Sequence, residues 1–259
     1  MHFRTLLAAS AALLITTAAA QAAQVAALWG DNSISIVDTG AKKVVKTWKI
    51  QGINGRVVGI DVRPADGMLY ALAADGGVYT VDTATGKATM KSKLETMLPA
   101  GSSATVDFNP AADRLRVIGS DGTNLRANVD DGKVTTDGKL RYGDNDANKG
   151  KTPKVVAGAY INSVKGAKET ALYDIDAAAG VLARQAPPND GILNTIGALG
   201  PKVEMVAFDI WSDGQKNEAW LMVGDTLHSV DLSTGKASPA AKISGVGGEV
   251  RDIAILPGM

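Results

Sequence analysis

The chain has 259 residues, 45% of them hydrophobic, and its 27 Lys and Arg balance 27 Asp and Glu. This length allows a single domain with a sizeable core, and the lack of net charge argues against nucleic acid or an anionic membrane surface as a partner. The sequence has no cysteine and two histidines, one of them at position 2, which excludes disulfides, thiolate metal sites and a zinc site with several histidines.

The N-terminus has the pattern of a secretory signal peptide. Arg4 precedes an apolar run that ends at about Thr17, and an Ala-rich tract follows. We predict a signal peptide over residues 1–22, cleaved near Ala20 to Ala23, and a periplasmic or secreted mature protein. The apolar run is too short to span a bilayer and no later stretch qualifies, so we expect no membrane span.

The stretch from Val58 to Lys91 has the pattern of one propeller blade. Apolar runs alternate with turn residues at Pro64–Gly67, Asp75–Gly77 and Asp82–Gly86, which predicts four short strands. An apolar run that ends in Asp before a Gly-containing turn recurs at Asp38, Asp82, Asp130, Asp176 and Asp231. Repeats of about 40 to 50 residues with four strands each are typical of a β-propeller.

We therefore predict an all-β fold, a five-bladed β-propeller over residues 24–258. Four blades are expected over residues 56–94, 102–139, 153–186 and 201–243. The remaining blade is composite, because residues 24–50 lack an opening strand and residues 249–256 have that pattern at the other end of the chain. The C-terminal strand is expected to pair with the N-terminal blade, since an open ring would leave a bare strand edge.

Two long polar segments, residues 141–153 and 187–200, connect the predicted blades. We interpret both as links from an outer strand to the next inner strand, which would place them on the same face over adjacent blades. Loops held by a rigid ring are common binding sites. The candidate ligand-binding residues there are Asp144, Asp146, Asn148, Asn189, Asp190 and Asn194.

The first of these segments partly resembles a calcium loop. Asp144, Asp146 and Asn148 offer oxygen ligands at alternate positions. The glycine stands at the seventh place of the loop rather than the sixth, and Val155 occupies the twelfth place, where a Glu is required. A solvated turn explains the same residues equally well. Calcium is the one cofactor considered, and no other is predicted.

Asp61, Asp107 and Asp209 occupy equivalent places on three predicted inner strands, where the other two repeats have Tyr160 and Ala254. These acids could line a central tunnel as a cation site, or supply the carboxylates of a glycoside-cleaving enzyme. We favour a structural role in which each accepts backbone N–H bonds in the neighbouring turn. Trp211, just after an inner strand, is a candidate for stacking on a sugar.

Several segments resemble a bacterial exported family of unknown function whose members are described as propeller-like. They are Val106–Val117, Asn124–Arg126, Ala159–Asn162, Pro188–Gly191 and Leu193–Gly197. The resemblance extends from about Leu28 to Leu256. It implies a propeller and export, and it implies no activity and no catalytic residues.

The sequence thus favours an exported, monomeric, non-catalytic binding module for a small molecule, a glycan or a protein partner. The alternative is a hydrolase that acts on sugars or lactones through the inner-strand carboxylates. Convergence of those carboxylates with pKa values pushed apart would favour the hydrolase. A carboxylate tied by hydrogen bonds into its own turn would favour the binding module.

Overall fold

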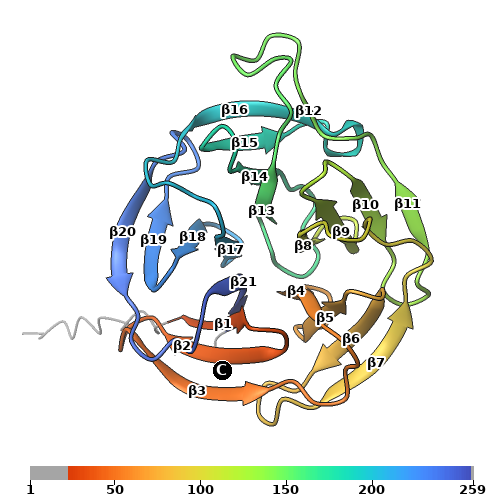
Figure 1. Cartoon of the computed structure of the whole chain (residues 1–259), viewed down its shortest axis with the longest axis vertical. Coiled ribbons are helices and arrows are strands. Elements are labelled where there is room, and N and C mark those ends of the chain that lie inside the picture. Colours follow the sequence, from red (N-terminus) through yellow and green to blue (C-terminus); the bar gives the residue numbers. More distant parts are fainter. Residues whose placement is uncertain (1–22, 258–259) are drawn as a thin grey trace, which may run out of the picture.

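The computed structural model describes residues 23–257, which form five antiparallel sheets arranged as blades around a central axis (Figure 1). The predicted signal peptide lies outside the described residues. Each blade has four strands from axis to rim, and a short fifth strand joins one of them. Within residues 23–257, no helix is long and apolar enough to cross a membrane.

The blades are numbered here from the one that holds the N-terminal strands. Blade 1 contains β21 (Val250–Leu256), β1 (Gln24–Trp29), β2 (Ser33–Asp38) and β3 (Lys43–Lys49). Blade 2 contains β4 (Val57–Val62), β5 (Leu69–Ala73), β6 (Gly77–Val81) and β7 (Ala88–Lys93). Blade 3 contains β8 (Ala104–Asn109), β9 (Arg114–Gly119), β10 (Asn124–Ala127) and β11 (Val134–Thr136). Blade 4 contains β13 (Val155–Tyr160), β14 (Leu172–Asp176), β15 (Val181–Gln185), β16 (Ile192–Ala198) and the added β12 (Arg141–Tyr142). Blade 5 contains β17 (Ala207–Ser212), β18 (Asn217–Val223), β19 (Thr226–Val230) and β20 (Ala237–Lys242).

The turns of blade 2 show why this sequence folds into short strands. The carboxylate of Asp82 accepts the backbone N–H groups of Ala84 and Thr85, and Gly86 follows with a φ of 77°. The carboxylate of Asp75 likewise accepts the N–H of Gly77. Asp and Gly together thus satisfy the turn backbone and reverse the chain, as predicted from their spacing.

The C-terminal strand closes the ring, as predicted. In blade 1, β21 pairs antiparallel with β1, so that Gln24 lies opposite Leu256 and Ala26 opposite Ala254. The two ends of the described chain therefore meet in one sheet, and β21 becomes its innermost strand. This pairing removes the free edge that β1 would otherwise present.

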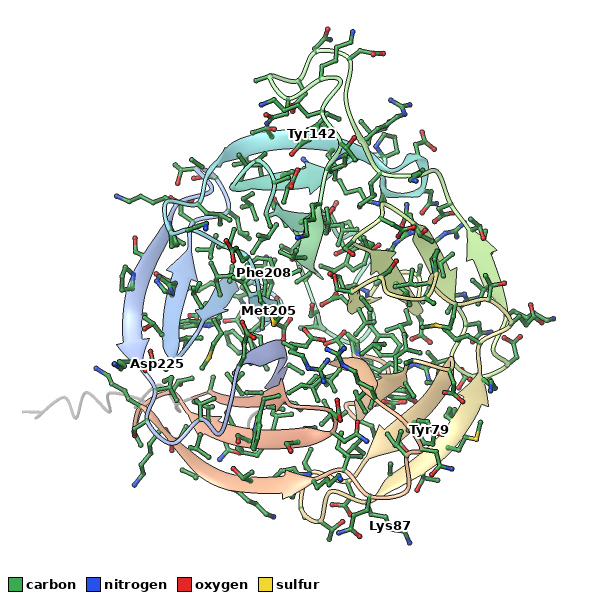
Figure 2. All side chains as sticks on the ribbon, viewed as in Figure 1. Tyr79, Lys87, Tyr142, Met205, Phe208 and Asp225 are labelled. Atoms are coloured by element: carbon green, nitrogen blue, oxygen red, sulfur yellow. The ribbon has the colours of Figure 1, made fainter. Side chains whose placement is uncertain are left out.

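An apolar cluster fills each of the five joints between neighbouring blades. At the joint between blades 1 and 2, for example, Leu28 and Ile36 pack with Ile60 and Leu69. Figure 2 shows side chains filling the spaces between the sheets all round the ring. The core is thus divided among the joints, and each blade is held by both of its neighbours.

Backbone contacts also join neighbouring blades at the rim. The end of each outer strand meets the turn that precedes the next outer strand, as in the bond from the N–H of Glu95 to the carbonyl of Gly132. A Cβ atom at Gly132 would lie 2.1 Å from the carbonyl oxygen of Lys93. Only glycine allows this approach, which explains the glycine that ends the repeated turn.

Blade 4 differs from its predicted range, 153–186, because its outer strand β16 was predicted as a loop. The Asp176–Gly180 turn joins the second and third strands here, whereas Asp82 and Asp231 follow third strands. In blade 4, the turn before the outer strand ends at Gly191 and is therefore equivalent to the turn that ends at Gly86 in blade 2. A Cβ atom at Gly191 would lie 2.3 Å from the carbonyl oxygen of Gly138. The Asp176–Gly180 turn has the same Asp and Gly chemistry as the outer turns of the other blades, so the repeat pattern did not distinguish it from them.

The predicted placement of the two long segments on one face is also wrong. Residues 187–191 form a hairpin turn with a short 3-10 helix at Pro188–Asp190, and β16 follows. Residues 141–153 begin with β12, which pairs in parallel with β16, and then project outward beyond the rim (Figure 1). The two segments do meet, but at the rim where blades 3 and 4 join.

Candidate functional site

Aspartates on the inner strands form hydrogen bonds from blade to blade around the axis. Asp61 accepts the backbone N–H of Phe108 at 2.6 Å, and Asp107 accepts that of Tyr160 at 3.0 Å. Asp209 accepts the N–H of Ile255 at 2.6 Å, and Asp252 accepts that of Ile60 at 2.8 Å. Four of the five joints are therefore bridged by a carboxylate. This supports a structural role, but the donors lie on inner strands of neighbouring blades and not, as predicted from the sequence, in the neighbouring turn.

The sequence alignment of these acids was partly wrong. Because the donors are Phe108 and Tyr160, the residue equivalent to Asp107 on β13 is Ala159 rather than Tyr160. Asp252 was missed because it lies two residues before Ala254, on the same face of β21 but nearer the start of the strand. Among the described residues, no carboxylate bridges β13 to β17, so this joint alone lacks one.

The electrostatics of the axis follow from burial and like charge. Burial, followed by the charge of Asp209, raises the pKa of Asp61 well above its ordinary value. Burial raises the pKa of Asp107 likewise, with Asp61 the next contributor, and burial raises the pKa of Asp209 to about 6. Backbone N–H bonds oppose these shifts, but burial and the charges of the neighbouring carboxylates outweigh them.

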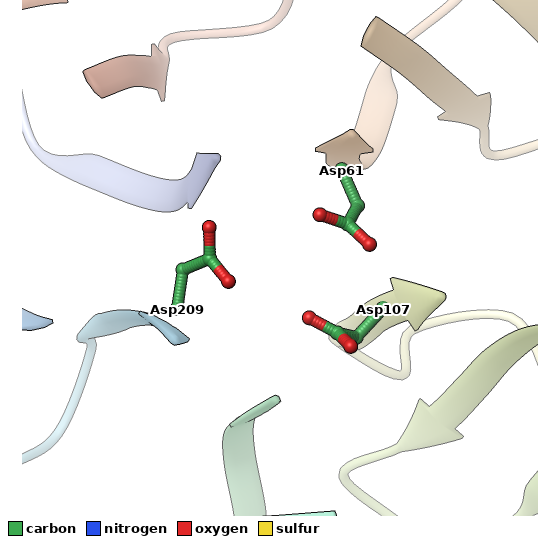
Figure 3. A group of neighbouring side chains, drawn as sticks. All are labelled: Asp61, Asp107 and Asp209. Atoms are coloured by element: carbon green, nitrogen blue, oxygen red, sulfur yellow. The ribbon is translucent and has the colours of Figure 1, made fainter. Parts of the chain in front are cut away.

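The three carboxylates converge (Figure 3). One oxygen each from Asp61, Asp107 and Asp209 lies within 4.8 Å of the other two. Oxygen atoms so arranged are ligands that hard divalent cations prefer. However, both oxygens of Asp61 and of Asp209 already accept backbone N–H bonds, so a cation would have to share them.

A cavity of about 250 Å³ opens beside this cluster at the carboxyl ends of the inner strands. Its lining comes from four blades: Asp61, Val62, Pro64 and Gly67 of blade 2, Ser163–Lys165 of blade 4, Asp209–Ser212 of blade 5, and Ile255 and Pro257 at the end of the chain. The links from outer to inner strands lie at the opposite ends of these strands. The cavity therefore opens on the other face from the one predicted to bind a ligand.

The predicted calcium loop is fastened to β16. Asp146 accepts the backbone N–H of Thr195 at 2.5 Å and its hydroxyl at 2.9 Å, and the amide of Asn148 donates to the same hydroxyl at 3.0 Å. Asp144 is exposed and pairs with Lys149. These contacts account for Asp146 and Asn148 within the fold, and calcium binding stays a prediction.

The other predicted binding residues lie nearby. The side-chain oxygen of Asn189 accepts a bond from Arg116, and the amide of Asn194 donates to the carbonyl of Ala186. Asp190 is exposed at the end of the short 3-10 helix. The structure thus brings the two predicted segments together, with most of their polar side chains bonded within the protein.

A second buried acid lies between blades 3 and 4. Asp174 is fully buried, and neither of its oxygens accepts a hydrogen bond from a described residue. A Cβ atom at the facing Gly158 would lie 2.4 Å from Oδ1 of Asp174, so this carboxyl group lies directly against β13. Burial raises the pKa of Asp174 to about 8.

The class that this fold and site define is a five-bladed β-propeller with buried carboxylates at its axis. The chain belongs to a family described as a domain of unknown function, DUF4394, whose model matches residues 33–254. No curated protein matches the chain.

Among solved structures, a Bacteroides thetaiotaomicron protein of unknown function is similar to this chain with a TM-score of 0.53 and 16% identity, over 93% of this chain and 68% of that one. A protein of unknown function from Bacteroides caccae has a TM-score of 0.47 and 12% identity, over 92% of this chain and 100% of that one. An auxiliary nutrient binding protein from Bacteroides thetaiotaomicron has a TM-score of 0.46 and 14% identity, over 73% and 53%. At these identities the likeness concerns the fold alone.

Proposed function

We propose that the protein is an exported, monomeric, non-catalytic binding module whose ligand enters the axial cavity. The observation that carries this proposal is the cavity itself, because loops from four blades converge on it and buried carboxylates belong to its lining. Sites of this kind combine apolar walls with a few convergent polar groups. At about 250 Å³, the cavity fits a small molecule or a single sugar unit.

The chemistry of the lining indicates a ligand with hydrogen-bond donors and an apolar face. Carboxylate oxygens of Asp61 and Asp209 accept hydrogen bonds, and each oxygen retains a lone pair beyond its backbone bond. Trp211, half-buried in the wall, offers an aromatic surface. A hydroxylated ring with one apolar face, such as a sugar, matches both features.

The test compares two lysines of one loop. Lys165 lines the cavity, whereas Lys168 is an exposed residue three positions further on that does not. Lys165→Trp is expected to weaken ligand binding at least tenfold, because the indole would occupy the cavity, and Lys168→Trp is expected to leave it unchanged. Binding is measured by calorimetry with a panel of monosaccharides and small polyols. Equal effects of the two substitutions, or no binding by the unaltered protein, would contradict the proposal.

Export is tested separately. Intact mass of the protein recovered from the periplasm or the medium is expected to lack about the first 20 to 23 residues, in keeping with a cleaved signal peptide. A full-length chain retained in the cytoplasm would contradict export without affecting the binding proposal.

The convergence of three carboxylates keeps a hydrolase as the second candidate. Among residues 23–257, Asp107 accepts a hydrogen bond through Oδ1 only, which leaves Oδ2 to contact a substrate. Burial raises the pKa of all three groups, as a general acid requires. Turnover of chromogenic glycosides or lactones that Asp107→Asn abolishes would favour the hydrolase over the binding module.

A further inference from the structure

A second hollow lies next to the axial cavity on the same face. It measures about 430 Å³ and is lined by residues 67–69, 80–83, Lys87 and Thr89 of blade 2. Gly67 belongs to the lining of both hollows, which therefore adjoin at the turn between β4 and β5. Lys87, labelled in Figure 2, lies at the outer turn of the same blade.

The backbone at Gly67, which both hollows share, borders open space. Gly67 has a φ of 72°, and a Cβ atom there would have no heavy atom within 4 Å. The neighbouring Met68 is 46% exposed, one of four large apolar side chains so exposed among residues 23–257.

The lining of the outer hollow combines hydroxyl groups with apolar groups. The hydroxyl groups of Thr80, Thr83 and Thr89 can each donate and accept hydrogen bonds, and Met68 and Val81 belong to the same lining. Sugars present hydroxyl groups at their edges and C–H groups on their faces, so both kinds of contact are matched. Asp82 and Lys87 add one charge of each sign, which favours a neutral chain over a strongly charged one.

We propose that the ligand is a neutral oligosaccharide that places one sugar in the axial cavity and continues across Gly67 into the outer hollow of blade 2. This inference rests on the proposed function and specifies its ligand class. The axial cavity alone is smaller than most ligand pockets, which run from about 300 to 1,000 Å³. The adjoining hollow supplies the remaining surface that a chain of several sugars would need.

The experiment compares chain lengths and two matched threonines. Thr89 and Thr135 are exposed and occupy the second position of the outer strands β7 and β11, but only Thr89 lines the outer hollow. Calorimetry would use glucose and N-acetylglucosamine with their tetrasaccharides cellotetraose, maltotetraose and chitotetraose. We expect one tetrasaccharide to bind at least tenfold more tightly than its monosaccharide. Thr89→Trp should abolish this gain and leave monosaccharide binding unchanged, whereas Thr135→Trp should preserve both.

The outcomes separate the two proposals. Equal affinity for a tetrasaccharide and its monosaccharide, or a gain that survives Thr89→Trp, would overturn the extended site and leave the axial cavity as the whole site. The same holds if a small molecule binds in a Lys165-dependent way and no tetrasaccharide binds more tightly. If the unaltered protein binds none of these sugars or small molecules, the proposed function itself would be overturned.

Discussion

Asp174 is a buried acid whose ionisation would cost the fold free energy. It is fully buried, its oxygens accept no hydrogen bond from residues 23–257, and burial raises its pKa to about 8, against about 3.8 in the unfolded chain. The folded state therefore binds the proton more tightly. The stability that this group contributes is fully present below pH about 4 and is lost as the pH rises through about 8.

Asp174→Asn should remove this part of the pH dependence, because an amide does not ionise. We expect the variant to gain stability relative to the unaltered protein between pH 5 and pH 8, by about 1–3 kcal/mol. The measurement is the free energy of unfolding in urea at several pH values. If the free energy of unfolding depends on pH in the same way for both proteins, the ionisation of Asp174 does not affect stability and the prediction is wrong.

The axial carboxylates show how far single residues could be predicted. Asp61, Asp107 and Asp209 were found because the repeat aligns them, and their structural role follows from the cost of leaving buried N–H groups unpaired. Asp252 was not predicted, because its place in the repeat differs by two residues. The cavity was not predicted either, because its lining comes from loops far apart in the sequence, and only ring closure brings them together.

At the scale of elements, the segment from Gly143 to Pro153 depends on β16 for its position. Asp146→Ala removes the acceptor for two bonds from Thr195, so we expect a loss of about 1–2 kcal/mol and faster tryptic cleavage at Lys149 and Lys151. Asp144→Ala is the matched control, since the exposed Asp144 forms an ion pair with the exposed Lys149 and does not bond to β16. Cleavage rates and melting temperatures would be compared for both variants.

The same pair of variants tests the calcium prediction. If Asp146 serves only to fasten the loop, calcium and EDTA should leave the melting temperature of the unaltered protein unchanged. A calcium-dependent rise that both Asp144→Ala and Asp146→Ala abolish would instead establish a bound ion, because the oxygen ligands would then act together.

Most strands were predictable because turn chemistry repeats with the blades. The strand β16 was not, although it completes blade 4. Its sequence, ILNTIGA, includes Asn, Thr and Gly and is only partly buried, and β12 pairs along its outer edge. The strand is thus specified by a neighbour that precedes it by about 50 residues, and a local pattern does not contain that information.

For the whole molecule, closure of the ring makes the last strand indispensable. Removal of residues 248–259 would take away β21, the partner of β1, together with the Asp252 bridge to Ile60 and the N–H of Ile255 that Asp209 accepts. It would also remove the apolar residues of β21 from two joints. We expect the truncated chain to lack a cooperative thermal transition.

A circular permutant separates loss of the strand from loss of its chain position. Because Gln24 lies opposite Leu256, a short linker can join residue 257 to residue 23, and new ends can be placed at the exposed Ala100 and Gly101 in the link between blades 2 and 3. Blade 1 then becomes continuous in sequence, with every joint retained. We expect this permutant to fold with circular dichroism like that of the natural chain order, since stability resides in the closed ring and not in where the chain begins. A folded truncation would show that the ring does not depend on closure through β21. An unfolded permutant would show that stability depends on where the chain begins and not on the closed ring alone.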